Sequence, residues 1–392
     1  MNPSIGVPLF QYSLAGGVAI VSGWWTILSI VALPRPREAA VGASSNGPRL
    51  AVIVPAHNEE PLIEKTVGSL RHAAGFLSPT PTIIVVADNC TDGTADQAED
   101  AGANVLIRTD ESLRGKSFAL EFAIEHLRNL PTGSQPDAVV IVDADTVVSA
   151  NLFERISSRL QDGADVVQVH YAAAHGPTPV VRLRRLALGL AHWSRPLGAS
   201  RLGLPTTLKG NGMAFRWALI RDGFPGSGIT EDAAATLSLA RQGTVVVYEP
   251  HATVWGLMAS TYRDAAVQDE RWEGGRIGMT RASLSTGIQL LLRGRIRAAA
   301  ACVELASPPL TLVVAASTLS MLLASVGAGS TTLGGAAFVL TLTYVGVGLA
   351  ATRPSREDLA AVVHAPRFIV HKLRTYARLL RGKPKAWERT LR

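Results

Sequence analysis

Val139-Val140-Ile141-Val142-Asp143-Ala144-Asp145 is the stretch that decides the fold, because an apolar run ends directly on two carboxylates. A short, fully apolar run is typical of a strand that is buried on both faces. Two carboxylates at the end of such a strand are suited to a divalent cation, which prefers oxygen ligands together with substrate phosphates. An Asp-x-Asp triplet also occurs in loops and helix caps, so a structural role stays open for the triplet alone. We predict that Asp145 and Asp143 bind a metal.

The segments around this stretch alternate between strand and helix patterns. The predicted strands are Leu50–Val54, Thr82–Ala87, Asn104–Ile107, Ala138–Val142 and Asp165–Val169, with helical spacing between them. Apolar strands that alternate with helices predict an α/β fold with a mostly parallel sheet covered on both faces. Ligands of such sheets bind beyond the carboxyl ends of the strands. The loops at 55–59, 88–92 and 143–146 therefore belong to one rim.

Two further groups of residues, which lie before Asp143 in the sequence, are suited to binding a nucleotide. Asp88 ends the second predicted strand, where its carboxylate can accept hydrogen bonds from a base or ribose, while Thr91-Asp92-Gly93 forms a turn and helix cap. Arg114-Gly115-Lys116 precedes a predicted helix, where cations oppose the helix dipole unless a phosphate binds there. Two solvated charges are the alternative for Arg114 and Lys116.

The second half of the chain contains candidates for catalysis and for sugar binding. Glu231 and Asp232 follow Thr230 at the start of a predicted helix, so capping competes with a role for Asp232 as general base. Gln268, Arg271 and Trp272 share one helical face, which suits a sugar diphosphate and a stacked sugar ring better than a core. The loop Gly210-Asn211-Gly212 is the predicted acceptor side. For His170 and Trp193, the sequence leaves two alternatives: a position on the acceptor side or a buried structural role.

The hydropathy pattern predicts membrane helices. Apolar residues make up 47% of the 392 residues, and no charged side chain precedes Arg35. Leu14–Leu33 is long enough for a bilayer span, and a cleaved signal peptide is the alternative, although no basic residue precedes the apolar run. A second uncharged run, Leu305–Thr352, would form a helix of about 70 Å and must fold back. We predict spans near Leu310–Val326 and Ala336–Ala351, with breaks at 327–332 and at Gly334-Gly335.

The charges beside these spans predict their orientation. Arginines follow the first span, precede the second and follow the third, which places residues 35–304 and the C-terminal tail in the cytoplasm. Residues 353–392 contain eleven Lys and Arg against three acids, which suits an anionic membrane surface. The net charge of +7 therefore does not require nucleic acid, since no basic stripe with interleaved aromatics is present. Cys90 and Cys302 lack metal-ligand spacing and suit a reducing compartment.

Taken in order along the chain, these motifs resemble the family 2 inverting glycosyltransferases, in particular the membrane-embedded branch with the cellulose, chitin and hyaluronan synthases. The matching pieces over about residues 50–280 are Val54-Pro55-Ala56-His57-Asn58-Glu59, Asp88, Gly115-Lys116, Asp143 and Asp145 (DxD), Glu231-Asp232, and Gln268-x-x-Arg271-Trp272 (QxxRW). The resemblance implies a GT-A fold, a nucleotide-sugar donor such as a UDP-sugar, and magnesium or manganese. It assigns donor binding to Pro55, His57, Glu59, Asp88, Lys116, Asp143, Gln268, Arg271 and Trp272, and catalysis to Asp232 with Glu231.

The resemblance has limits. One span before the domain and two after it cannot readily enclose a polymer channel, so export would need an oligomeric channel. A membrane nucleotidyltransferase or a scaffold that only binds nucleotide are the other classes considered. The leading expectation is transfer to a lipid-linked or growing glycan acceptor in envelope polysaccharide or glycolipid biosynthesis.

The expected organisation has six parts in an inner (plasma) membrane protein. They are an anchor at 1–34, a linker at 35–49, a cytoplasmic catalytic domain at 50–272, interfacial amphipathic helices at 273–305, two transmembrane helices at 306–352, and a basic cytoplasmic tail at 353–392. Val181–Leu197 is a further candidate for an interfacial helix, with ordinary packing on the domain as the alternative.

Overall fold

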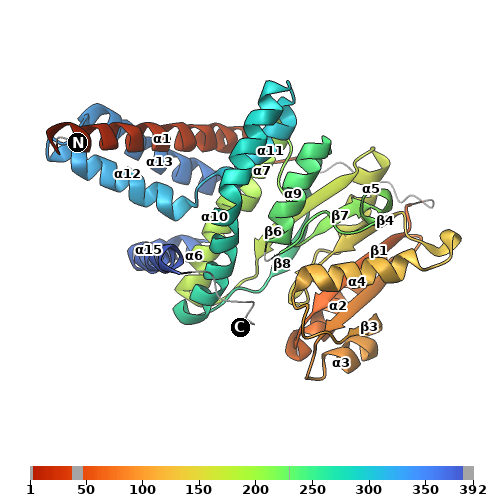
Figure 1. The fold of residues 1–392 in the computed structure, drawn as a ribbon. Helices are drawn as coiled ribbons and strands as arrows, with labels where there is room; N and C mark the ends of the chain where they lie inside the picture. The colour runs from red at the N-terminus through yellow and green to blue at the C-terminus, as the bar shows by residue number, and fades with distance from the viewer. Residues whose placement is uncertain (1–2, 38–46, 229, 383–392) are drawn as a thin grey trace.

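The computed structural model describes residues 3–37, 47–228 and 230–382 (Figure 1). Residues 38–46 of the expected linker and residues 383–392 of the expected tail lie outside the described residues. The described strands form one eight-stranded sheet in the order β3-β2-β1-β4-β7-β6-β8-β5. Helices of the apolar run and the C-terminal segment lie to one side of the domain that contains this sheet.

The first half of the sheet follows the predicted alternation closely. Its strands β1 (Leu50–Ala56), β2 (Thr82–Asp88), β3 (Asn104–Arg108) and β4 (Ala138–Ile141) pair in parallel. The helices between and after them are α2 (Glu60–Ala74), α3 (Thr94–Asp100), α4 (Lys116–Arg128), the short η1 (Thr132–Ser134) and α5 (Leu152–Gln161). Side chains of β1 alternate between two apolar cores, with Val52 and Val54 in one and Ile53 in the other. Burial on both faces explains why these strands are apolar throughout.

The second half of the sheet is mixed. Its strands are β5 (Thr146–Val148), β6 (Val166–Ala173), β7 (Met213–Arg216) and β8 (Val246–Gly256). β7 is antiparallel to both β4 and β6, β5 is antiparallel to β8, and β6 is parallel to β8. The predicted α/β fold is confirmed, with four of the seven described strand pairings parallel. The sequence analysis did not anticipate β5, β7 and β8; β5 and β7 are too short to show a periodicity.

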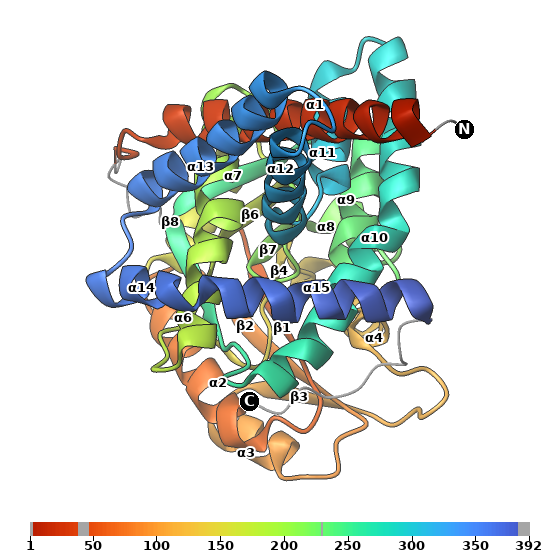
Figure 2. The same cartoon turned by 90° about the vertical axis from the view of Figure 1, so that its left-hand side faces the viewer.

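Three apolar helices lie side by side away from the sheet (Figures 1 and 2). They are α1 (Pro3–Ala32), α12 (Leu310–Ser325) and α13 (Thr331–Thr352). The turn between α12 and α13 lies beside Gln11 of α1, whose amide donates a hydrogen bond of 3.1 Å to Ser320 Oγ. The predicted break at 327–332 is therefore present, but Gly334-Gly335 lies inside α13 and does not interrupt it.

Two of these helices are long and apolar enough to cross a membrane, at Gly6–Ala32 and Thr331–Thr352. α12 has 16 residues and reaches that length only together with α11 (Ile296–Ala306), from which it is bent by 73°. The first and third predicted spans thus correspond to helices that are long enough to cross a membrane. The predicted span near Leu310–Val326 is a shorter helix that is continuous with a bent partner.

A long helix, α10 (Tyr262–Leu292), connects the domain that contains the sheet to α11 and the apolar helices. The expected boundary between 272 and 273 falls inside this one helix. The segment Val181–Leu197 forms α6 (Pro179–Leu188), the π-helical turn η2 (Gly189–Ser194) and the start of α7 (Arg195–Arg201). Other described helices are α8 (Trp217–Ile220), α9 (Glu231–Gln242), α14 (Arg356–Ala360), η3 (Ala361–His364) and α15 (Ala365–Arg381). α15 lies across α10 and close to α6 (Figure 2).

Candidate active site

A cavity of about 770 Å³ extends from the tips of the parallel strands to the apolar helices. We call its two parts the donor end, beside the ends of β1, β2 and β4, and the membrane end, beside α7, α11 and the start of α12. The predicted site residues that line the cavity are Pro55, His57, Glu59, Asp88, Lys116, Asp143, Asp145, Gly210, Glu231, Asp232, Arg271 and Trp272. The predicted residues outside the lining are Gln268, Asn211 and Gly212. One cavity thus brings together loops that are far apart in sequence.

The loops after β1 and β2 support each other at the donor end. Asn58 and Asn89 have φ angles of 55° and 51°, a left-handed conformation that Asn tolerates better than most residues. The side-chain oxygen of Asn58 accepts a 2.7 Å hydrogen bond from the amide of Thr91. Nδ1 of His57 lies 2.7 Å from the carbonyl oxygen of Asp88. The two strand ends therefore form one preorganised wall.

Asp88 is held by a cation that the sequence analysis did not identify. Arg108, the last residue of β3, lies 2.6 Å from the Asp88 carboxylate, and both side chains are buried. Arg108 also donates to the carbonyl of Leu113, which ties the loop before α4 to the same carboxylate. A charged residue at the end of an otherwise apolar strand was the available signal. Asp88 is thus oriented by Arg108 toward the rim of the cavity.

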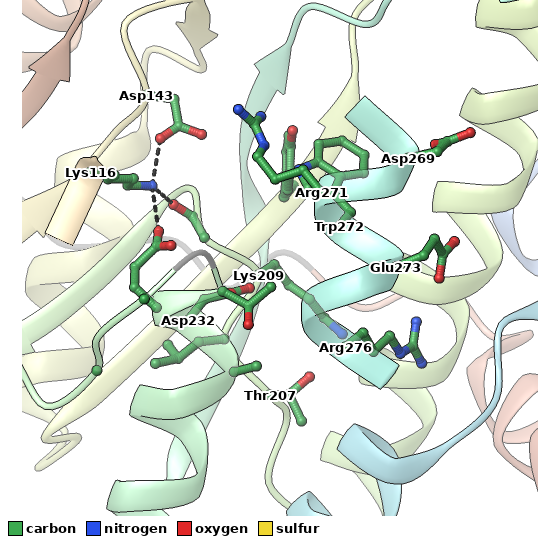
Figure 3. A pocket seen from close by; sticks show the side chains of 18 of the residues that line it. Lys116, Asp143, Thr207, Lys209, Asp232, Asp269, Arg271, Trp272, Glu273 and Arg276 are labelled. Atoms are coloured by element: carbon green, nitrogen blue, oxygen red, sulfur yellow. Dashed lines mark hydrogen bonds and ion pairs between the residues drawn. The ribbon is translucent and has the colours of Figure 1, made fainter. Parts of the chain in front are cut away.

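Lys116 connects three elements at the centre of the cavity. Its ammonium lies 2.6 Å from Asp143 and 3.2 Å from Glu231, and it donates to the carbonyl of Gly210 (Figure 3). Lys116 is the first residue of α4, and the preceding Gly115 has a φ of 129°, which favours glycine. The lysine that the sequence assigned to phosphate binding therefore also links the Asp-x-Asp loop to the start of α9.

These contacts shift the titration of the central groups. Burial lowers the pKa of Lys116, but the carboxylates of Asp143 and Glu231 outweigh burial and hold that pKa above its usual value. Burial raises the pKa of Glu231 to about 7, against the attraction of Lys116. Burial also raises the pKa of Asp232, while backbone amides at the start of α9 and the charges of Lys116 and Lys209 act in the opposite direction. A carboxylate with a raised pKa is better matched to accepting a proton near neutral pH.

The Asp143–Asp145 turn is braced from both sides. Thr66 of α2 donates a 2.7 Å hydrogen bond to the carbonyl of Ala144, and Asn211 accepts one of 3.2 Å from the amide of Asp143. Asn211 also donates to Thr146 over 2.8 Å. Asn211 therefore supports the turn from a fully buried position, whereas Gly210, of the predicted loop Gly210-Asn211-Gly212, lines the cavity.

The turn is chemically suited to a magnesium or manganese ion. The carboxylates of Asp143 and Asp145 both line the cavity, and oxygen ligands are those that these ions prefer. One oxygen of Asp143 contacts Lys116, and one oxygen of Asp145 accepts a 3.3 Å hydrogen bond from the hydroxyl of Thr146. No group of three or more His, Cys, Asp or Glu side chains within the described ranges could hold a metal on its own. The residues present fit an ion that completes its coordination with substrate phosphates and water.

The Gln268–Trp272 segment of α10 is fixed by charged side chains from two other helices. Arg184 of α6 donates to both Gln268 and Asp269, and its guanidinium lies 5.6 Å from the ring centroid of Trp272. Lys372 of α15 lies 3.0 Å from Asp269. Gln268 is 1% exposed and serves this contact inside the protein. Arg271 and Trp272 lie on the side of α10 that faces Asp143, whereas Asp269 points the other way (Figure 3).

The sequence motifs, the sheet order and this cavity agree with one family. Residues 48–275 match the model of glycosyltransferase-like family 2, which is more than half of the chain. The chain belongs to this family.

Curated relatives of this family 2 protein are similar over part of their length. The probable glycosyltransferase YdaM of Bacillus subtilis is 24% identical over 240 residues, covering 58% of this chain and 55% of YdaM. Glycosyltransferase AglJ of Haloferax volcanii is 28% identical over 138 residues, covering 35% of this chain and 41% of AglJ. The chain thus spans about half the length of these relatives. Protein RfbJ of Shigella flexneri is 31% identical over 119 residues, covering 30% of this chain and 81% of RfbJ.

Among solved structures, the mannosyltransferase PcManGT from Pyrobaculum calidifontis has the same fold over most of its length. The TM-score is 0.52 with 18% identity, and the match covers 90% of this chain and 98% of PcManGT. At this identity the likeness establishes the fold. That fold extends beyond the segment that the family match covers.

Proposed function

We propose that this family 2 protein is a membrane-bound inverting glycosyltransferase that moves a sugar from a nucleotide-sugar donor to an acceptor hydroxyl in one displacement. The observation that carries this proposal is the position of Asp232, which shares one cavity with the Lys116–Asp143 pair and with Arg271. A base, a metal-binding turn and fixed cations in one cavity are what such a transfer requires. The activities named for the relatives point to the same reaction class.

The donor end is suited to a nucleoside diphosphate. Asp88 and the loop that contains His57 would contact the nucleoside, and a UDP-sugar is the donor we expect. A magnesium or manganese ion at Asp145 and Asp143 would supply positive charge to the departing diphosphate. PcManGT, which has this fold, was solved with GDP-Man and Mn²⁺. Arg271 and Lys116 would add fixed positive charge on the same leaving group.

The acceptor would approach from the opposite side of the sugar. Asp232 would take the proton of the acceptor hydroxyl as its oxygen bonds to the anomeric carbon. The bond from that carbon to the diphosphate breaks, and the electron pair leaves with the nucleoside diphosphate. Attack on the face opposite the leaving group inverts the anomeric configuration. Trp272, with the guanidinium of Arg184 beside its ring, would provide the stacking surface for the sugar.

A membrane location is part of the proposal. α1 and α13 are long and apolar enough to span, and the outer part of α10 and α11 exposes large apolar side chains: Leu284, Ile288, Leu291, Leu292 and Ile296. Exposed apolar side chains beside arginines suit a helix at a bilayer surface. The flanking charges favour a cytoplasmic catalytic domain at the inner membrane. The product class would be a glycolipid or an envelope polysaccharide.

The test is donor turnover by the full chain in detergent. UDP release from a panel of UDP-sugars should require Mg²⁺ or Mn²⁺ and should increase when membrane lipid extract is added. Undiminished turnover in Asp232→Asn would contradict the role of the base. Mass spectrometry of the product separates the alternatives, because a polymer would indicate a processive synthase and a new phosphate bond a nucleotidyltransferase.

A further inference from the structure

The membrane end of the cavity contains three cations from different elements. Lys209 belongs to the loop before β7, Arg195 begins α7, and Arg276 lies on α10. Arg276 donates a 2.8 Å hydrogen bond to the carbonyl of Ser307, at the bend between α11 and α12. The guanidinium of Arg195 lies 4.5 Å from the ring centroid of Trp25 in α1. The three side chains therefore converge where the catalytic domain meets the apolar helices.

The positive charge of this cluster exceeds the negative charge beside it. Glu304 of α11 lies 3.5 Å from Arg195 and is its one carboxylate partner within the described ranges. Nε of Arg195 is buried and has no hydrogen-bond partner among the described residues. Lys209 lies between Asp232 and the helix of Arg276 (Figure 3). Like charges gathered in a partly buried space are unfavourable unless an anion joins them.

Burial and the surrounding charges both act on the pKa of Lys209. Burial lowers the pKa of Lys209 to about 8, with Arg195 and Arg276 acting in the same direction and Glu304 and Asp232 in the opposite one. The neighbouring His192 is neutral near pH 7, because burial and the charge of Lys209 lower its pKa. An anion bound here would stabilise the charged form of the lysine and raise its pKa. Three cations from separate elements thus face two carboxylates, Glu304 and Asp232, which leaves an excess of positive charge for an anionic ligand.

The rest of the membrane end is apolar. Leu305, Pro309, Leu310 and Tyr344 line it, and they belong to the segments that enter the three-helix set α1, α12 and α13. A small inorganic anion would gain nothing from this apolar wall. A ligand with an anionic group followed by hydrocarbon would use both the cations and the wall. Guanidinium groups favour phosphate in particular, because their planar donors match its oxygens.

We infer that the acceptor is an amphiphile with a phosphate group, which lies against Lys209, Arg276 and Arg195 while its hydrocarbon contacts α11, α12 and α13. This inference rests on the proposed function and names the substrate class of the same site. The phosphate would place a hydroxyl of the same molecule next to Asp232. In the transfer, that hydroxyl gives its proton to Asp232 and bonds to the anomeric carbon, and the nucleoside diphosphate leaves with the electron pair.

The experiment measures acceptor binding without donor. The full chain in maltoside micelles is titrated calorimetrically with dihexanoyl phosphatidylglycerol, which has a phosphate, hydroxyls and short acyl chains. Dihexanoyl phosphatidylcholine and inorganic phosphate are the comparison ligands. We expect phosphatidylglycerol to bind at least tenfold more tightly than either. Equal binding of phosphatidylcholine, which has no net charge, would contradict a site for an anionic ligand. Equal binding of inorganic phosphate would contradict a contribution of hydrocarbon to binding.

Variants then locate the site. Lys209→Met and Arg276→Met should each weaken phosphatidylglycerol binding tenfold or more, and Lys209→Arg should retain it. Arg281→Met, an exposed position on the same helix as Arg276, should bind like the wild type. Unchanged binding in both methionine variants would overturn the inference. The affinity for UDP with Mg²⁺ reports folding of each variant, and UDP-sugar turnover reports the proposed function separately from lipid binding.

Discussion

The two ends of the cavity differ in how their charges are balanced. At the donor end, carboxylates and cations are paired, Asp88 with Arg108 and Asp143 with Lys116. At the membrane end, three cations, Lys209, Arg195 and Arg276, lie near two carboxylates: Glu304, 3.5 Å from Arg195, and Asp232, which acts on Lys209. Asp232 lies between these two parts.

This difference indicates what each end binds. Carboxylates beside fixed cations suit a metal ion together with a diphosphate, since carboxylates bind the ion and the ion and cations offset the charge of the phosphates. An excess of cations against an apolar wall suits an anion attached to hydrocarbon. Four changes test this comparison, from the largest expected effect to the smallest.

Removing the base between the two ends should have the largest effect. Asp232→Asn should lower kcat by about 10²- to 10⁴-fold, the range for general base catalysis, because the acceptor hydroxyl keeps its proton. The affinity for UDP with Mg²⁺ should stay near that of the wild type. Steady-state kinetics and calorimetry measure the two quantities, and exposed Asp222→Asn is the matched control. A loss of UDP affinity equal to the loss of kcat would place Asp232 in donor binding instead.

Removing the proposed metal ligand Asp145 should affect the donor end alone. Asp145→Ala should reduce kcat/KM for the donor on the order of 100-fold or more, because the leaving diphosphate loses the charge that the ion supplies. Chelation of the wild type should have a similar effect that added Mg²⁺ or Mn²⁺ reverses. Exposed Asp100→Ala provides the control. Binding of the anionic amphiphile should be unchanged, and its loss in Asp145→Ala would contradict the separation of the two ends.

Overpacking between α10 and the start of α9 should displace the two ends of the cavity relative to each other. A Cβ at Gly275 of α10 would overlap the side chain of Thr230, next to Glu231 and Asp232, whereas a Cβ at Gly278 meets nothing within 4 Å. Overpacking costs about 1–3 kcal/mol, so Gly275→Ala should lower transfer by about tenfold through displacement of the base. Gly278→Ala should retain activity and slightly favour the helix. Equal activity of the two variants would show that α10 and α9 adjust independently.

A rise in pH should neutralise the lysine of the membrane end before the lysine of the donor end. The pKa of Lys209 is about 8, while the pKa of Lys116 is raised, so Lys209 loses its charge first as pH rises. The acceptor KM should therefore increase as pH rises through 8, and the donor KM should not. Lys209→Arg keeps its charge and should remove this dependence. An acceptor KM that rises equally in Lys209→Arg would assign the effect to another group.

The donor end could be predicted from the sequence because each of its parts follows a strand directly. A buried parallel strand has a strong local pattern, and its carboxyl end faces the ligand whatever the rest of the fold does. Pro55, Asp88 and Asp143 were found in this way, and the predicted order of strands and helices in this half was confirmed. The role of Asn211 was not predictable, since its partners Asp143 and Thr146 are distant in sequence.

The membrane end was decided by tertiary structure alone. Arg195 and Arg276 belong to amphipathic segments, and no sequence motif distinguishes them from other arginines of the chain. Lys209 stands beside the Gly210-Asn211-Gly212 loop without a motif of its own. Only the packing of α7, α10 and α11 against the ends of the apolar helices brings their charges together. Hydropathy and strand periodicity are local properties, so the sequence determined the family, the donor rim and the apolar helices. The convergence of charges from separate elements depends on packing at long range, which no local pattern records.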